Sequence, residues 1–220
     1  MDVNAFLAVT GRRIGLRPAR PHPSSRFVKI GFLGGSFDPV HFGHLCAALD
    51  ACEQGQLERV VFVPTAHIPH KRQAMQSSGA DRLALLRLAI EENSRFEISD
   101  YELRHGGVSY TIDSVRHFRR QYPHDRLFWI VGGDQLAKLH LWRDIRELAQ
   151  SIEFIFIARP GHPVETRGDI PGLRLHRCDG HNLDISSTEL RARVKRGLSL
   201  DCFAPTAVVA AIVKKGLYRS

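Results

Sequence analysis

Two histidines and a pair of glycines occur close together near the start of this 220-residue chain, in the stretch 34–44, GGSFDPVHFGH. The stretch lies between an apolar run at 27–33, typical of a buried strand, and residues 45–52, typical of a helix. Backbone N–H groups at such a turn, together with the helix N-terminus, can bind an anion. His41 and His44 are three residues apart, so both can face one point, donate hydrogen bonds to phosphate oxygens and stabilise developing charge.

Two other roles fit the same pair of histidines. The side chains can simply cap the helix that follows them. They can also bind a metal ion, because His67 and His70 repeat the HxxH spacing. The chain has no HExxH sequence, and tetrahedral zinc sites usually use a closer set of Cys, His and carboxylate ligands. Zinc is therefore the weaker interpretation, and we predict no metal ligands in the protein.

A second group of hydroxyl and cationic side chains occurs in the segment 185–191, ISSTELR. Its hydroxyls precede a predicted helix, and Arg191 follows Thr188 by about one turn. Alone, this pattern fits an N-cap followed by a solvated arginine. Combined with the glycine-rich turn it predicts a second phosphate clamp, because helix amides, a hydroxyl and a guanidinium all bind phosphate. Lys71, in the loop after a predicted second strand, adds another cation.

The chain also carries an acidic residue and a tryptophan where a nucleotide could use them. Asp134 follows two glycines at the end of an apolar run, where it can accept hydrogen bonds from a ribose diol or cap a turn. Trp142 is either a core residue or a stacking platform for a planar ring. The sequence lacks GxxxxGK[ST], GxGxxG and a nucleophile elbow. These observations favour direct phosphoryl or nucleotidyl transfer by positioning and charge neutralisation.

Strands and helices alternate along the predicted elements. This order predicts an α/β fold, a Rossmann-like doubly wound parallel sheet of five to six strands with helices on both faces. Ligands of such sheets bind beyond the carboxyl ends of the strands, so the stretch 34–44, the loop 65–71, residues 132–134 and the segment 185–191 should converge on one cleft. The further strands are expected at 59–64, 96–98, 127–131, 153–158 and 173–176, and the helices at 81–92, 112–122, 135–150 with a break near 140–142, 186–195 and 205–215.

Charge and composition restrict the remaining classes of protein. The net charge is +8, but residues 1–26 contain five arginines, one aspartate and several prolines, and we interpret them as a flexible basic leader before a single domain at 27–220. A targeting peptide is the lesser alternative for this leader. The four cysteines form no CxxC pair, which favours free thiols in a reducing cytoplasm. No apolar run approaches the roughly 20 residues that span a membrane. A basic nucleic-acid-binding module is the alternative from another class, although we expect no nucleic-acid partner.

The two phosphate-binding stretches resemble the signatures of a known family. GGSFDPVHFGH resembles GxFDPxHxGH, and ISSTELR resembles ISSTxxR, both typical of the nucleotidyltransferases related to class I aminoacyl-tRNA synthetases. The segments between and after them are similar to those of the bacterial nicotinate-nucleotide adenylyltransferase family: Pro69-His-Lys71, Ser109-Tyr-Thr111, Gly133-Asp134, Trp142-Arg-Asp-Ile145, Arg159-Pro-Gly161 and Gly216-Leu-Tyr218.

This resemblance implies adenylyl transfer from ATP to nicotinate mononucleotide in cytoplasmic NAD biosynthesis, giving nicotinate adenine dinucleotide and pyrophosphate. The attack is in line, without a covalent intermediate, and Mg²⁺ accompanies the ATP phosphates. Nicotinamide mononucleotide and phosphopantetheine are the alternative acceptors, and the oligomeric state stays open. By matching positions, the catalytic residues would be His41, His44 and Arg191; the ATP-binding residues Gly34, Gly35, Ser36, Phe37, Asp134, Ile185, Ser187, Thr188 and Arg191; and the acceptor-binding residues Lys71, Tyr110, Thr111 and Trp142.

Overall fold

A six-stranded parallel sheet forms the centre of the molecule in the computed structural model, which describes residues 27–67, 75–158, 169–181 and 183–219. The strand order is β3-β2-β1-β4-β5-β6, and each neighbouring pair is parallel. The order reverses between β1 and β4, which makes the carboxyl ends of these two strands the switch point where ligands bind. The strands are β1 Lys29–Gly35, β2 Arg59–Pro64, β3 Phe96–Ile98, β4 Arg126–Gly132, β5 Glu153–Ala158 and β6 Leu175–Asp179.

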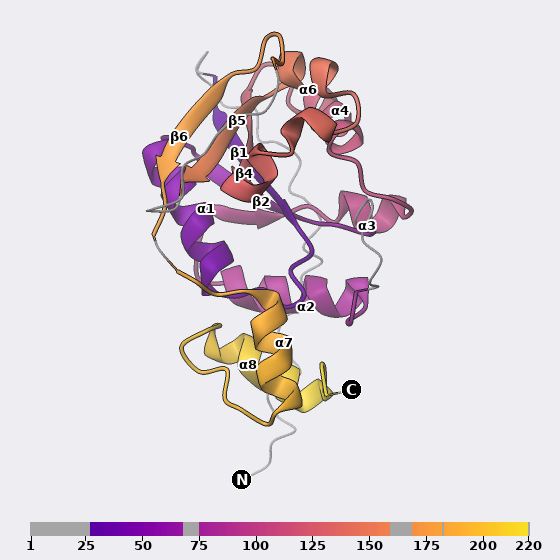
Figure 1. Ribbon diagram of the computed structural model, residues 1–220, viewed down its shortest axis with the longest axis vertical. Coiled ribbons are helices and arrows are strands. Elements are labelled where there is room, and N and C mark those ends of the chain that lie inside the picture. The colour runs from indigo at the N-terminus through magenta and orange to yellow at the C-terminus, as the bar shows by residue number, and fades with distance from the viewer. Residues whose placement is uncertain (1–26, 68–74, 159–168, 182, 220) are drawn as a thin grey trace.

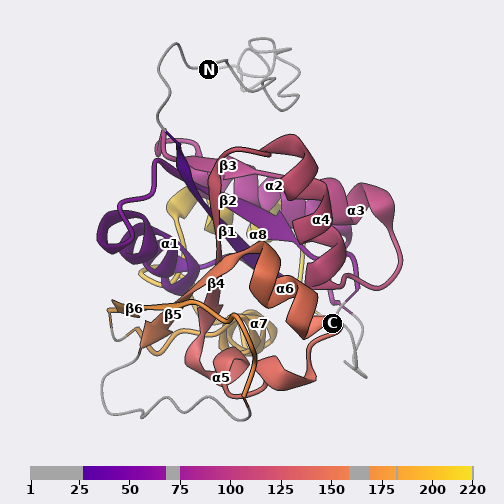
Figure 2. The same cartoon turned by 90° about the horizontal axis from the view of Figure 1, so that it is seen from above.

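Helices cover both faces of this sheet, so successive residues of a central strand enter different hydrophobic cores. In β1, Phe32 packs in the core under α4 and α6, whereas Leu33 packs in the core under α1 and α2. Figure 2 shows α1 on one side of the sheet and α4 and α6 on the other. The described helices are α1 Phe42–Gln54, α2 Gly79–Ile90, α3 Tyr101–His105, α4 Thr111–Gln121, α5 Gly133–Leu136, the 3-10 turn η2 Leu139–Leu141, α6 Ile145–Ser151, α7 Ser187–Lys195 and α8 Thr206–Lys215.

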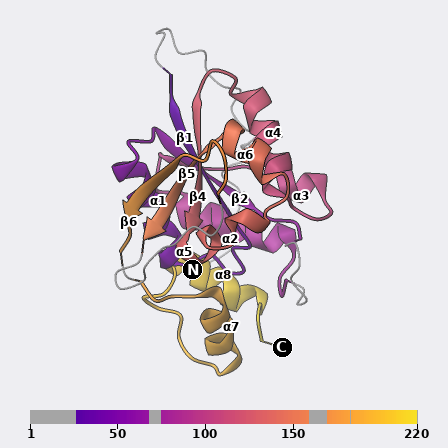
Figure 3. The ribbon, with the colours of Figure 1, turned by 45° about the horizontal axis from the view of Figure 1, so that its top comes forward.

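The last two helices form a small lobe beyond the strand ends. In Figure 1, α7 and α8 lie together below α2, and the arrowhead of β6 points toward their end of the molecule. Figure 3 shows the same pair apart from α4 and α6. Leu190 of α7 and Val208 and Ile212 of α8 are buried in the core that also holds α1 and α2. The lobe therefore shares the main core and lies next to the carboxyl ends of the strands.

The predicted fold class and order of elements are confirmed, with shifts at element ends. Gly34 and Gly35 belong to β1, so the strand predicted at 27–33 ends two residues later, where Gly35 pairs with Pro64. The sixth strand lies at Leu175–Asp179 rather than 173–176. The break predicted within 135–150 is present, because α5, η2 and α6 divide this segment. The short helix α3 was not predicted, and the predicted leader lies outside the described residues.

Among the residues that the structure describes, no helix is both long and apolar enough to cross a bilayer.

Candidate active site

A cavity of about 1240 Å³ opens at the carboxyl ends of the central strands. It is larger than the roughly 300–1,000 Å³ of pockets that take one drug-sized ligand, which leaves room for two nucleotides. Each of the four segments expected to converge contributes described residues to its wall. These are Gly34, Gly35, Ser36, His41, Gly43 and His44 from the first stretch, Thr65 from the loop after β2, Gly132 at the end of β4, and Ile185, Ser186 and Ser187 before and at the start of α7.

The two histidines lie at the N-terminus of α1 with their rings against each other. His41 is the N-cap residue and is buried, and the ring centroids of His41 and His44 are 3.8 Å apart. The backbone N–H of His41 donates to Nδ1 of His44 at 3.3 Å. The pair therefore caps the helix and lines the cavity at the same time, so the capping and phosphate-binding interpretations of the sequence are compatible.

This capping bond determines which hydrogen His44 offers to the cavity. Since Nδ1 accepts a hydrogen bond, the hydrogen of the neutral ring is on Nε2, which becomes a donor. Burial, and then the nearby His41, lower the pKa of His44 well below its ordinary value of 6.5. His44 is therefore neutral at physiological pH and can donate a hydrogen bond to an anion without carrying a positive charge.

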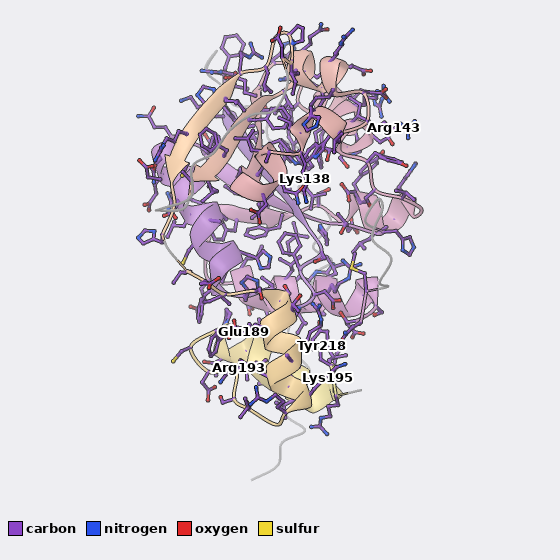
Figure 4. All side chains as sticks on the ribbon, viewed as in Figure 1. Lys138, Arg143, Glu189, Arg193, Lys195 and Tyr218 are labelled. Carbon is purple, nitrogen blue, oxygen red and sulfur yellow. The ribbon has the colours of Figure 1, made fainter. Side chains whose placement is uncertain are left out.

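The charge of the cavity wall suits anionic ligands. Among the described lining residues, Glu102 is the one carboxylate, and burial raises its pKa, which favours the neutral acid. Lys138 and Arg143 line the same wall from the segment after β4 and are exposed (Figure 4). The described wall thus combines cationic side chains and helix amides with little negative charge, as two phosphate-bearing ligands require.

Side chains of α7 connect the second motif to the first. Ser187 Oγ donates to the carbonyl oxygen of Pro39 at 2.9 Å, and Arg191 Nη1 donates to that of Asp38 at 2.7 Å. Arg191 Nη2 also donates to Thr188 Oγ1 at 3.2 Å. Neither Thr188 nor Arg191 is among the lining residues, so contacts of these two side chains with ATP stay predictions. What the geometry gives is a direct link from α7 to the turn that carries the histidines.

The cavity wall also contains residues predicted to bind the acceptor. Tyr110, Thr111 and Trp142 all line it. The Arg143 guanidinium lies over the Tyr110 ring, 4.6 Å from its centroid, as in a cation–π contact. Trp142 is half-buried and meets Phe154 edge to face, with centroids 6.3 Å apart. Trp142 therefore packs on the core and still faces the cavity, so both of its proposed roles are compatible with the structure.

Three other predicted site residues are not among the described lining residues of the cavity. Phe37 is fully buried and meets His44 in a T-shaped contact at 5.0 Å, so its side chain supports His44 from the core, and its contact with ATP stays a prediction. Asp134 is exposed in α5 and is not among the lining residues, which leaves its ribose contact a prediction. Lys71 lies outside the described residues.

Sequence reasoning missed two carboxylates next to the site. Glu102 is 5% exposed and accepts a hydrogen bond from Ser114 Oγ at 2.6 Å, behind the loop with Tyr110. Asp50 of α1 accepts hydrogen bonds from the backbone N–H and the ring Nδ1 of His181, which lines the cavity. Asp50 lies in α1 and Glu102 in the five-residue helix α3, and a single carboxylate in either helix gives no signal in one sequence.

Metal ligation by the histidines was the other interpretation of their spacing. Over the described residues, which exclude His70, no group of three His, Cys, Asp or Glu side chains is close enough together to hold an ion.

The fold and the cavity define an α/β nucleotidyltransferase. A family model described as cytidylyltransferase-like matches residues 32–193, well over half of the sequence. The chain therefore belongs to the cytidylyltransferase-like family. The matched segment includes both histidines and the start of α7.

Individual relatives carry a more specific name. A protein of Opitutus terrae named probable nicotinate-nucleotide adenylyltransferase is 64% identical over 192 residues, which cover 87% of this chain and 98% of that protein. One of Methylacidiphilum infernorum with the same name is 39% identical, covering 86% and 92%. The solved structure of Plasmodium falciparum nicotinic acid mononucleotide adenylyltransferase complexed with NaAD has a TM-score of 0.71 at 18% identity, covering 87% and 97%. At that identity the structure shows a shared fold.

Proposed function

We propose that this chain transfers the adenylyl group of ATP to nicotinate mononucleotide, forming nicotinate adenine dinucleotide and pyrophosphate in NAD biosynthesis. The observation that carries the reaction class is the histidine pair at the start of α1, which faces a cavity with little negative charge in its described wall. The choice of acceptor is supported by the name of the relative that is 64% identical.

The chemistry divides between the two ends of the cavity. A phosphate oxygen of the mononucleotide attacks the α-phosphorus of ATP, forming one P–O bond, while the bond to the departing pyrophosphate breaks. Negative charge increases on the oxygens of the leaving group and of the transferred phosphate. His44 donates its Nε2 hydrogen to these oxygens, and His41 and the first amides of α1 add further donors. The ribose contact of Asp134 and the phosphate contacts of Thr188, Arg191 and Lys71 belong to the same proposal.

The acceptor end holds the pyridine nucleotide in position for this attack. Trp142 stacks on the pyridine ring, and Tyr110 and Thr111 form the adjoining wall. Lys138 and Arg143 keep this end cationic, so that a mononucleotide with a phosphate and a ring carboxylate is attracted. Positioning of the two reactants supplies much of the rate acceleration, because no protein nucleophile takes part.

The described cavity wall leaves the binding of a magnesium ion that arrives with ATP mainly to the ATP phosphates. Mg²⁺ prefers oxygen ligands and often binds through substrate phosphates with one or two carboxylates. The one lining carboxylate among the described residues, Glu102, is buried and hydrogen-bonded to Ser114. The ATP phosphates would therefore hold the ion, which neutralises their charge when bound.

Pyrophosphate release tests the proposed function. Purified protein is incubated with MgATP alone, with nicotinate mononucleotide, and with nicotinamide mononucleotide, and pyrophosphate is measured in a coupled assay. We expect release that depends on nicotinate mononucleotide, with the dinucleotide detected by mass spectrometry. Preference for the amide would overturn the acceptor, and absence of release with either acceptor would overturn the reaction.

A further inference from the structure

Asp38 is a buried carboxylate at the centre of the turn between β1 and α1. It is 4% exposed, and three donors from distant parts of the chain reach its side chain. The backbone N–H of Gln76 donates to Oδ2 at 2.8 Å, while Ser77 Oγ donates to Oδ1. Tyr218 Oη also donates to Oδ1, at 2.8 Å. A buried carboxylate with this many donors is held firmly in one orientation.

The end of α8 directs Tyr218 to this position. Gly216 adopts a left-handed conformation with φ 62°, and Leu217 N–H donates to the carbonyl oxygen of Ile212, which ends the helix in the Schellman pattern. Tyr218 itself has φ 64°, a conformation that non-glycine residues rarely adopt. The side chain is 4% exposed and lies where the α7–α8 lobe meets the rest of the molecule (Figure 4). A rare backbone conformation held by specific bonds often marks a functional constraint.

The same turn is bonded along its backbone to α2 and α7. Arg82 Nη1 donates to the carbonyl oxygen of Ser36 at 2.8 Å. The carbonyl oxygen of Asp38 accepts from Arg191, so α7 and Tyr218 hold two different groups of one residue. His41 lies three residues after Asp38, so a displacement of the turn would move both histidines.

We infer that Tyr218 is a positioning residue for the ATP end of the site, acting through its hydrogen bond to Asp38. Tyr218 is not among the described residues that line the cavity, so it would act through the groups to which it is bonded. Its hydroxyl fixes the carboxylate, the carboxylate fixes the turn, and the turn sets the positions of the two histidines and of Arg191 relative to the ATP phosphates. This inference rests on the proposed function for the identity of the acceptor, but its ATP-binding consequence is independent of the acceptor.

Tyr218→Phe removes the hydroxyl and keeps the ring, which makes it the direct test. Tyr122→Phe is the matched control, because Tyr122 is also buried, 7% exposed, at the end of α4 and away from the cavity lining. We expect Tyr218→Phe to weaken MgATP binding in calorimetry by about tenfold, the loss of one hydrogen bond to a charged group, and to lower kcat by a similar factor. The KM for the mononucleotide should change by no more than about twofold, well below the tenfold change that corresponds to the loss of one hydrogen bond to a charged group.

The outcomes separate positioning from general stabilisation. The inference is supported when Tyr218→Phe weakens MgATP binding and lowers kcat but leaves the KM for the mononucleotide unchanged. Tyr122→Phe should change the binding of neither substrate. It is overturned when the two variants bind both substrates alike, or when Tyr218→Phe weakens the binding of both substrates equally. Ser77→Ala removes the other hydroxyl donor to Oδ1 and must show the same selectivity, which covers the case in which Tyr218→Phe does not fold. If the wild type binds MgATP but transfers nothing to the mononucleotide, the acceptor assignment fails while the calorimetric comparison still decides the role of Tyr218.

Discussion

His44 combines a structural and a chemical function in one imidazole. Its Nδ1 accepts the N–H of His41 and so begins α1, while its other nitrogen carries the hydrogen available to a phosphate. Phe37 supports the ring from the core. Because the ring is fixed before any ligand binds, little reorganisation is required when charge develops on the phosphate oxygens.

Removal of the His44 ring tests this role in catalysis. We expect His44→Ala to lower kcat by about 100-fold or more, the range lost with one preorganised donor to a developing charge. Turnover of MgATP with nicotinate mononucleotide is the measurement, and a thermal melt verifies that the variant is folded. His124→Ala is the control, because His124 is exposed and lies away from the described cavity lining. Near-normal turnover of His44→Ala would contradict the assigned role.

The lowered pKa of His44 also predicts how stability depends on pH. The unfolded chain binds a proton at this residue near pH 6.5, whereas the folded chain binds it only at lower pH. His44 therefore has no destabilising effect above about pH 6.5, its ordinary pKa, and the free energy of unfolding falls as pH decreases from there toward the folded pKa.

Urea unfolding at pH 7.5 and 5.5 measures this effect, with His44→Gln as the variant. Glutamine at the third position of the helix keeps an acceptor for the cap, so this substitution removes the titration and preserves the capping box. The loss of stability at the lower pH should be smaller in His44→Gln than in the wild type and in His124→Gln. Equal losses in all three proteins would show that His44 does not carry the pH dependence.

At the scale of elements, apolar runs predicted the central strands, because strands buried on both faces contain few polar residues, whereas the polar edge strand β6, Leu175–Asp179, was predicted with shifted bounds. Helix starts were predicted less well. The start of α2 is set by Ser78, whose Oγ accepts the N–H of Asp81 at 3.0 Å, and an SxxD pattern was present in the sequence to indicate it. The five residues of α3 are too short for periodicity to be measured, and its Glu102 was missed with it.

Trp142 lies between η2 and α6, where it lines the proposed acceptor end of the cavity. This position predicts that the tryptophan affects the binding of the mononucleotide only. We expect Trp142→Ala to raise the KM for nicotinate mononucleotide by about tenfold, within the 1–3 kcal/mol of one base–aromatic stacking contact. The KM for ATP should not change, which provides an internal control. Trp142→Phe should recover part of the loss because it restores an aromatic face. An unchanged KM in Trp142→Ala would leave Trp142 as a packing partner of Phe154 alone.

At the scale of the whole molecule, the cavity is built from segments at 34–44 and 183–187 that only the fold brings together. The sequence predicted this convergence because ligand sites in parallel sheets occur at the carboxyl ends of strands. It did not predict the bond between Asp38 and Tyr218, since a hydrogen bond between residues 180 positions apart leaves no pattern in a single sequence.

Residues 1–26 hold half of the net charge, yet both phosphate-binding stretches, 34–44 and 185–191, come after them in the sequence. We therefore expect a variant that begins at residue 27 to keep its kcat and both KM values within about twofold, which corresponds to less than 0.5 kcal/mol. Steady-state kinetics and a thermal melt of the two proteins make the comparison. A variant that no longer folds, or that loses activity, would show that the boundary of the domain at residue 27 is wrong.

The link from Tyr218 to Asp38 also has a consequence for biosynthesis on the ribosome. Chains acquire structure from the N-terminus during synthesis at about 5–20 residues per second, so α1, which ends at Gln54, is synthesised roughly 8–33 s before residue 220 is added. For most of that interval the histidines are present but the Tyr218 hydroxyl, one of the three donors to the Asp38 side chain, has not been made. Nascent chains that extend past Arg191 but not yet to Tyr218 would contain both signature stretches and still bind ATP more weakly than the longer chain.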